Sequence, residues 1–136
     1  MSDELAAARA KRVAKMKEMP FDGQAFKRLV EAGLTWLRTN QQMVNALNVF
    51  PVPDGDTGTN MVLTMQSAYN EIKDLGHHKV TDMAAAVSQG ALMGARGNSG
   101  VILSQVWRGI ARGLEGEDVL TAANMARALA EARDTA

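Results

Sequence analysis

Apolar residues recur along much of this chain at the spacing of an amphipathic α-helix. Between residues 22 and 39 they fall at i, i+3, i+4, i+7 and i+11, and nearly the same spacing returns between 59 and 75. No run of residues alternates convincingly between apolar and polar as a half-buried strand would. The pattern predicts an all-α fold with helices at about 22–39, 59–75, 81–93, 99–114 and 118–134. The two clearest stripes are Phe26, Leu29, Val30, Gly33 and Leu37, and Met61, Met65, Ala68, Ile72 and Leu75.

Residues 1–19 are rich in alanine and charged side chains, and they form a further helix candidate. Lysine and arginine occupy positions 9, 11, 12, 15 and 17, but Asp3, Glu4 and Glu18 dilute this positive charge. We therefore interpret the segment as a solvated extension and not as a surface for membranes or nucleic acid. The expected organisation is a polar helical extension at 1–20 followed by one domain at 21–136.

Composition narrows the class of protein further. With 136 residues, of which 46% are hydrophobic, the chain can form one domain with an apolar core. Equal numbers of basic and acidic residues, 15 of each, give no overall field that would attract nucleic acid. The absence of cysteine excludes disulfides and thiolate metal sites. No apolar stretch approaches the ~18 residues of a membrane span, and the charged start of the chain lacks an apolar signal region, so we expect a cytoplasmic protein.

Aromatic residues and histidines offer little chemistry of their own. Trp36, Tyr69 and Trp107 lack the interleaved basic residues of a nucleic-acid stacking platform, so we expect them to be core or interface anchors. His77 and His78 have no metal-ligand spacing to a second group, which favours an ordinary loop position.

The most informative stretch is an acidic loop at residues 48–60. It places Asp54 and Asp56 close together, while no lysine or arginine occurs between Arg38 and Lys73. Two neighbouring carboxylates repel unless a cation lies between them, and a divalent ion with oxygen ligands is the obvious candidate. The alternative is a solvated turn, because Asp, Gly, Pro and Asn are ordinary turn residues. An EF-hand is excluded, since the twelfth position counted from Asp54 is Met65 and not glutamate.

A glycine-rich segment at residues 94–100 has the opposite character. Arg96 is the one charged residue between Met83 and Trp107. Asn98 and Ser99 are good N-cap residues for the apolar pattern that follows, and a helix N-terminus there would direct free N–H groups at an anion. The alternative is a plain glycine-rich connection between two helices with Arg96 in solvent.

One loop suits a divalent cation and the other an anion, and a magnesium nucleotide would satisfy both. The chain contains no Gly-x-x-x-x-Gly-Lys-Ser/Thr motif, no kinase glycine loop and no His-Arg-Asp segment. The expected phosphate site is therefore of another kind.

Two long sequence words, Leu47 to Met61 and Leu92 to Gln105, resemble those of a known family. This family is the nucleotide-binding domain of the dihydroxyacetone kinase L-subunit (DhaL) type, and the closest branch is the N-terminal ATP-binding domain of bacterial fatty acid kinases. The resemblance runs from about residue 21 to about residue 113, and more loosely to the end of the chain. It implies an antiparallel helical barrel or bundle that holds ATP through two Mg²⁺ ions at one end. The family pattern continues into further helices, so we expect a partial domain, incomplete at the C-terminus, and its activity alone is in question.

The resemblance also assigns site residues. It implies that Asp54 and Asp56 are metal ligands, with Asn48 at the position where the dihydroxyacetone branch typically has a third aspartate. That branch usually carries histidine where this chain has Thr57, a difference that favours the fatty acid kinase branch. The expected nucleotide-binding residues are Thr57, Gly58, Thr59, Asn60, Gly94, Ala95, Arg96, Gly97, Asn98, Ser99 and Gly100.

The implied activity is a kinase that transfers the γ-phosphoryl group of ATP. The favoured acceptor is a fatty acid carboxylate presented by a separate fatty-acid-binding carrier protein, giving an acyl phosphate and ADP. No general base stands out, and an ionised carboxylate needs none. Two alternatives stay open, namely a dihydroxyacetone (glycerone) kinase subunit and a nucleotide-binding module without turnover. Unburied apolar stripes would also favour a homo-oligomer.

Overall fold

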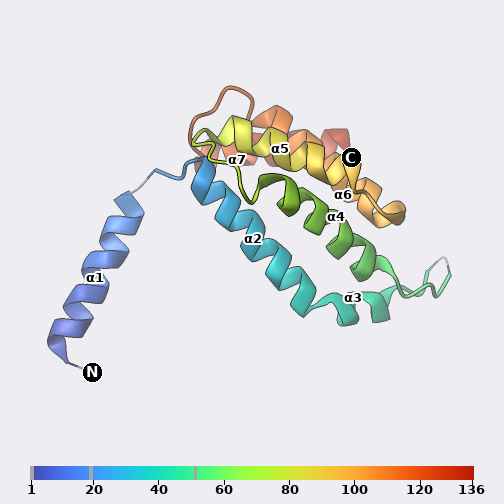
Figure 1. Cartoon of the computed structure of the whole chain (residues 1–136), viewed down its shortest axis with the longest axis horizontal. Helices are drawn as coiled ribbons and strands as arrows, with labels where there is room; N and C mark the ends of the chain where they lie inside the picture. Colours follow the sequence, from blue (N-terminus) through green and yellow to red (C-terminus); the bar gives the residue numbers. More distant parts are fainter. Residues whose placement is uncertain (1, 19, 51) are drawn as a thin grey trace.

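The computed structural model describes residues 2–18, 20–50 and 52–136 and forms seven α-helices. No strand occurs in these ranges, so the all-α prediction is confirmed. None of the helices described is long and apolar enough to cross a membrane. The helices are α1 (Asp3–Glu18), α2 (Gly23–Thr39), α3 (Gln41–Leu47), α4 (Thr57–Ile72), α5 (Val80–Met93), α6 (Gly97–Gly113) and α7 (Ala122–Thr135), as labelled in Figure 1.

Helix α1 leads away from the other six helices (Figure 1). Within the described part of the chain it packs against none of them. Its described side chains are exposed, as expected of a solvated polar helix. The division of the chain at residue 20 stays a prediction.

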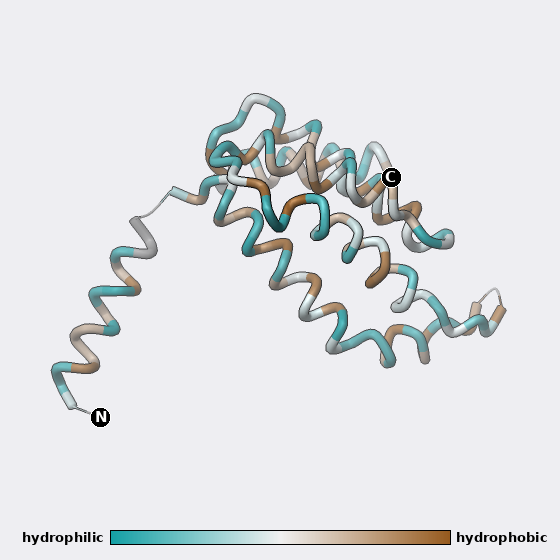
Figure 2. Tube along the Cα trace, in the orientation of Figure 1, coloured by the Kyte–Doolittle hydropathy of each residue, from teal (hydrophilic) through white to brown (hydrophobic). Residues whose placement is uncertain are grey.

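The core lies between α2, α4, α5, α6 and α7, with α7 packed on α6. Phe26, Ile72 and Met83 are among its largest fully buried side chains. The Trp107 ring meets Phe26 edge-on at 6.2 Å, and its indole N–H donates to the Met65 sulfur at 3.0 Å. Figure 2 shows hydrophobic positions recurring along α2 and α4, which is the periodicity expected of helices with one buried face.

The predicted stripe on α2 needs a correction. The buried apolar side chains are Phe26, Val30 and Leu34, whereas Leu29 is 43% exposed. Trp36, expected as a core or interface anchor, is 71% exposed and does not lie in the core. Helix α2 packs on α3, α4 and α5, and it also meets α6 through the edge-on pair of Phe26 and Trp107. The apolar residues of α2 therefore exceed what its packing buries.

One helix and one helix start also differ from the sequence prediction. Helix α3 was not predicted, because it spans 7 residues and buries none of them. Helix α7 begins after Thr121 and not at 118, because Thr121 and Asn124 form a capping box. The Thr121 side chain accepts from Asn124 N at 3.1 Å, and the Asn124 side chain accepts from Thr121 N at 2.7 Å.

Chain direction brings two helix starts together. The segments 73–79 and 94–96 are short and reverse the chain, so α5 runs antiparallel to both α4 and α6 (Figure 1). Helices α4 and α6 consequently run parallel and pack on each other. Their N-termini lie at the same end of the bundle, next to the acidic loop. His77 and His78 lie in the α4–α5 loop at the opposite end, as predicted.

Candidate functional site

The two segments predicted to form one site are adjacent in the structure. Asn60, in the first turns of α4, lies against Gly97, the first residue of α6, where a Cβ would clash with the Asn60 amide. A Cβ on Gly100 would lie 3.6 Å from the Asn60 carbonyl oxygen. The acidic loop and the glycine-rich segment therefore meet at the junction of α4 and α6.

Asp54 and Asp56 occupy the last turn of the acidic loop. Both residues are exposed, and neither forms an ion pair with any other described residue. Gly55 between them adopts φ 63°, a left-handed conformation that favours glycine. Asp56 is the N-cap residue of α4, yet its side chain makes no cap hydrogen bond. Both carboxylates are thus available to a ligand. Pro51, part of the same motif, lies outside the described residues.

Asn48 ties the loop to the start of α4. Its side-chain oxygen accepts a hydrogen bond from Asp56 N at 3.1 Å. An amide oxygen has two lone pairs, so this bond leaves room for a second partner. The role of Asn48 as a metal ligand stays a prediction, but the structure gives it a separate role in closing the loop.

Helix α3 caps α4 through side chains that the sequence pattern did not single out. Asn45 accepts from Thr59 N at 3.0 Å and donates to Thr59 Oγ1 at 3.0 Å. Gln41 also donates to Thr59 Oγ1, at 3.1 Å, and a Cβ on Gly58 would clash with the Gln41 carbonyl oxygen. Gly58 and Thr59 therefore hold α3, and their predicted contact with phosphate stays a prediction. The spacing of Gln41 and Asn45 by four residues was the available signal.

The N-cap prediction for α6 was wrong. The helix begins at Gly97, and its N-cap is Arg96, so Asn98 and Ser99 lie inside the first turn. Gly97 adopts φ 64°, which allows the chain to enter the helix two residues earlier than expected. Gly100 N donates to the Arg96 carbonyl oxygen at 3.0 Å.

Several N–H groups at this junction have no hydrogen-bond partner in the part of the chain that the structure describes. They belong to Thr57, Gly58, Gly97, Asn98 and Ser99. The first N–H groups of any helix lack intrahelical partners and carry the positive end of the helix dipole. Two parallel helices start here, so the junction can bind an anion.

The rest of the glycine-rich segment rests on α4. Gly94 lies so close to Ser67 that a Cβ would clash with it, and Arg96 N donates to Thr64 Oγ1 at 3.2 Å. Ala95 is half-buried, whereas the Arg96 side chain is exposed and forms no ion pair within residues 2–18, 20–50 and 52–136. The sequence pattern missed Thr64, whose hydroxyl binds the Arg96 backbone.

The acidic loop supplies a small set of oxygen donors for a hard divalent cation. No group of three His, Cys, Asp or Glu side chains in the described chain could hold a metal ion. Asp54 and Asp56 supply two carboxylates, and Asn48 supplies a nearby amide oxygen through its bond to Asp56 N. Mg²⁺ commonly takes one or two protein carboxylates and completes its shell with water and phosphate oxygens, so these residues fit that ion.

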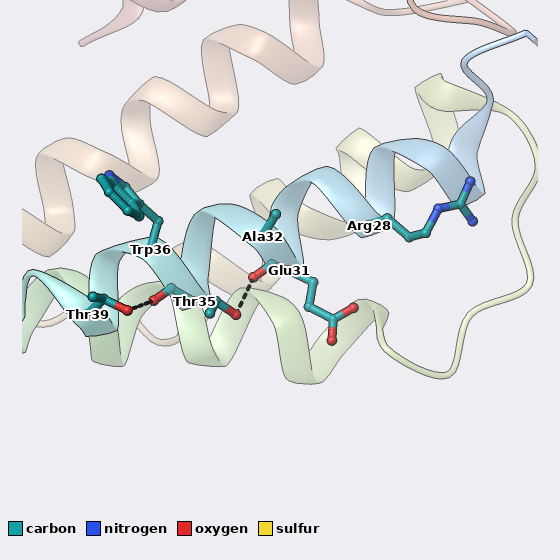
Figure 3. Close-up of a pocket in the computed structure, with 6 residues that line it drawn as sticks. All are labelled: Arg28, Glu31, Ala32, Thr35, Trp36 and Thr39. Atoms are coloured by element: carbon teal, nitrogen blue, oxygen red, sulfur yellow. Dashed lines mark hydrogen bonds between the residues drawn. The ribbon is translucent and has the colours of Figure 1, made fainter. Parts of the chain in front are cut away.

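A surface hollow away from this junction offers few free polar groups to a ligand. One of about 460 Å³ lies along the outer face of α2 and is lined by Arg28, Glu31, Ala32, Thr35, Trp36 and Thr39 (Figure 3). Its two threonine hydroxyls donate to the carbonyl oxygens of Glu31 and Thr35, at 3.1 and 3.0 Å, so they are already paired within the helix. This hollow contains neither of the two loop aspartates.

A family profile described as the DAK2 domain matches residues 51–136, so the chain belongs to the DAK2 domain family. Protein YloV of Bacillus subtilis is 47% identical over 115 residues, which cover 85% of this chain and 21% of that protein. Uncharacterized proteins of Staphylococcus haemolyticus and Staphylococcus saprophyticus are each 43% identical, with the same shares of each chain covered. The DhaL-type resemblance is thereby confirmed, and the chain spans about a fifth of the length of these relatives.

Proposed function

We propose that the junction of α4 and α6 binds a magnesium nucleotide, and that this domain holds ATP for phosphoryl transfer. One observation carries the proposal: the acidic loop and the glycine-rich start of α6 are in contact through Asn60 and Gly97. In this proposal, the carboxylates for a cation and the free N–H groups for an anion would serve one ligand. Membership of the DAK2 domain family supports a domain of the dihydroxyacetone kinase type.

Different residues would bind the metal ion and the phosphate groups. Asp54 and Asp56, with Asn48, would hold Mg²⁺, which neutralises phosphate charge when it is bound. The N–H groups at the starts of α4 and α6 would donate to phosphate oxygens, as helix N-termini do at other anion sites. Arg96 adds the one positive side chain of the glycine-rich segment. Positioning and charge neutralisation supply most of the catalysis in phosphoryl transfer, so such a site needs few reactive groups.

The proposed acceptor is a fatty acid carboxylate on a separate carrier protein. A carboxylate oxygen attacks the γ-phosphorus, the bond from the γ-phosphorus to the β,γ-bridging oxygen breaks, and the products are an acyl phosphate and ADP. The acidic loop also exposes Val49, Phe50 and Val52 to solvent, the first two at 66% and 85%. Exposed apolar side chains beside a polar site suit docking of a protein partner.

Calorimetric titration of ATP into the chain, with and without Mg²⁺, tests the nucleotide site. We expect binding that requires Mg²⁺, and failure to bind under both conditions would overturn the proposal. The acceptor is tested separately, in a protein that contains this domain at the full length of its relatives. Carrier-bound fatty acid should be phosphorylated; phosphorylation of dihydroxyacetone alone would assign the glycerone kinase alternative, and failure with both would leave a binding module.

A further inference from the structure

Thr64 is a buried hydroxyl of α4 whose contacts lead to the start of α6. Its side chain is 0% exposed. Oγ1 donates to the Asn60 carbonyl oxygen at 2.8 Å and accepts from Arg96 N at 3.2 Å. The first bond lies within α4, whereas the second joins two helices. A hydroxyl has one donor and two acceptor positions, so both bonds can form together.

The backbone of Arg96 is held from both sides. Its N–H is bound by Thr64, and its carbonyl oxygen accepts from Gly100 N at 3.0 Å, the first hydrogen bond of α6. The Arg96 side chain makes no cap bond, and its backbone is extended at φ −122° and ψ 126°. The Thr64 hydroxyl thus fixes the residue from which α6 starts.

Two glycines allow the first turn of α6 to rest directly on α4. A Cβ on Gly100 would clash with Thr64 Oγ1, and a Cβ on Gly97 would clash with the Asn60 amide. Asn60 and Thr64 are four residues apart and share one face of α4. This face determines both the height and the direction of the first turn of α6.

We infer that Thr64 is a positioning residue for the nucleotide site, an inference that rests on the proposed function. Thr64 acts through the backbone of Arg96, which fixes where the N–H groups of Gly97, Asn98 and Ser99 point. Valine at position 64 would fill nearly the same volume but leave Arg96 N without its partner. A donor deprived of its partner shifts toward another acceptor or toward water, and the first turn of α6 shifts with it.

Ser67 provides a matched control, because it lies on the same face of α4 about one turn further along. Its hydroxyl donates to the Gly90 carbonyl oxygen at 2.9 Å, at the end of α5. Gly90 O also accepts from Gly94 N at 3.2 Å, so it keeps a partner when the hydroxyl is removed. Ser67→Ala therefore removes a similar hydrogen bond without freeing the backbone of Arg96.

Amide NMR spectra of the 136-residue chain, recorded during titration with magnesium ATP, test this role. We expect the Gly97, Asn98 and Ser99 amides of the unmodified chain to shift. Thr64→Val should raise the dissociation constant about tenfold, whereas Thr64→Ser and Ser67→Ala should stay within about twofold. Should the valine variant not fold, Thr64→Cys replaces it, since the thiol is a weaker acceptor and should bind less tightly than Thr64→Ser.

The outcomes separate the two proposals. If the unmodified chain responds and Thr64→Val binds equally well, the positioning role is wrong while the nucleotide site stands. Equal weakening by Ser67→Ala and Thr64→Val would also reduce Thr64 to a packing residue. If the three amides of the unmodified chain do not respond to magnesium ATP, the proposed function is overturned, and the inference falls with it.

Discussion

At the residue scale, the Asp54 and Asp56 carboxylates carry the proposed metal site. Both are exposed, and neither is held by an ion pair with another described side chain. A substitution at either position therefore changes charge without breaking a packing contact. This separates the effect on ligand binding from the effect on stability.

Asp54→Asn or Asp56→Asn should remove the magnesium-dependent part of ATP binding. The free energy of unfolding should stay the same or rise slightly, because repulsion between two like charges is relieved. Calorimetry measures the first effect and thermal melting the second. Asp74→Asn, an exposed acid in the loop after α4, is the matched control and should keep full affinity. Unchanged magnesium-dependent affinity in both loop variants would rule out the metal assignment.

Asp22 supports a prediction about pH, away from the candidate site. It is the N-cap of α2, and its Oδ1 accepts from Ala25 N at 3.0 Å. This bond lowers the pKa of Asp22 below its ordinary value of 3.8, with burial opposing the shift and His78 assisting it. Because the pKa is lowered by folding, the carboxylate stabilises the fold above its unfolded pKa. That stability is lost as pH falls through the folded pKa.

Asp22→Ala should accordingly lower the free energy of unfolding by about 1 kcal/mol near neutral pH, the usual effect of losing an N-cap. The difference from the unmodified chain should shrink once the pH falls below the ordinary value of 3.8, and then disappear. Denaturant unfolding at a series of pH values measures it. A difference that stays constant through this acidic range would show that the carboxylate charge is not responsible.

At the element scale, α3 and the start of α6 position the site, and both depend on close polar contacts. Helix α3 buries none of its residues and is held to α4 by Asn45 and Gln41. The start of α6 is held by Thr64 and by glycines that lie too close to α4 for any side chain. Small changes in these contacts should alter ligand binding more than they alter the core.

Asn45→Ala should lower the free energy of unfolding by about 1 kcal/mol, because Thr59 N and Thr59 Oγ1 both lose a partner. Asn45→Ala should also weaken magnesium ATP binding, because the acidic loop connects α3 to α4. Hydrogen exchange at the Thr59 amide measures the local opening. Gln42→Ala, at an exposed position of the same helix, should change neither quantity. If Asn45→Ala leaves both Thr59 exchange and ATP affinity unchanged, the Asn45 contact does not hold α3 on α4 in the way proposed.

Gly97→Ala should cost about 1–2 kcal/mol of stability, because φ 64° is unfavourable for a residue with a Cβ, and the clash with Asn60 adds to this. ATP affinity should fall as well. Gly33→Ala is the control: no atom lies within 4 Å of a Cβ there, so alanine should stabilise α2 by about 0.4–1 kcal/mol. Thermal melting compares the two variants, and equal stability changes would contradict the strained start of α6.

The sequence predicted the long helices well, since their apolar period follows from burial of one face. It did not predict α3, whose stability comes from amide contacts with a helix that begins ten residues after α3 ends. It also placed the cap of α6 at Asn98 and Ser99, because a local pattern shows neither the positive φ of Gly97 nor its closeness to Asn60. The role of Thr64 was hidden for the same reason, as its partner lies 32 residues away. Contacts between helices far apart in the sequence cannot be read from the local pattern of apolar and polar residues.

At the scale of the whole molecule, α4 and α6 run parallel and start at the end proposed to bind nucleotide. An apolar groove of about 490 Å³ is lined by residues of α2, α3, α4 and α6. Its lining includes Trp36, Met43, Met61 and Leu103, of which Trp36 and Met43 are strongly exposed. Apolar surface of this kind commonly marks an interaction site. This groove is consistent with the predicted homo-oligomer, which stays a prediction.

The central claim is that the acidic loop and the start of α6 form one nucleotide site. Mn²⁺ in place of Mg²⁺ tests it directly, because a paramagnetic ion broadens the amide signals near it. With ATP present, Mn²⁺ should broaden both Asp54 to Asn60 and Gly97 to Gly100, while His77 to Lys79 at the opposite end stay sharp. Broadening confined to the acidic loop, or found mainly at the opposite end, would contradict the account.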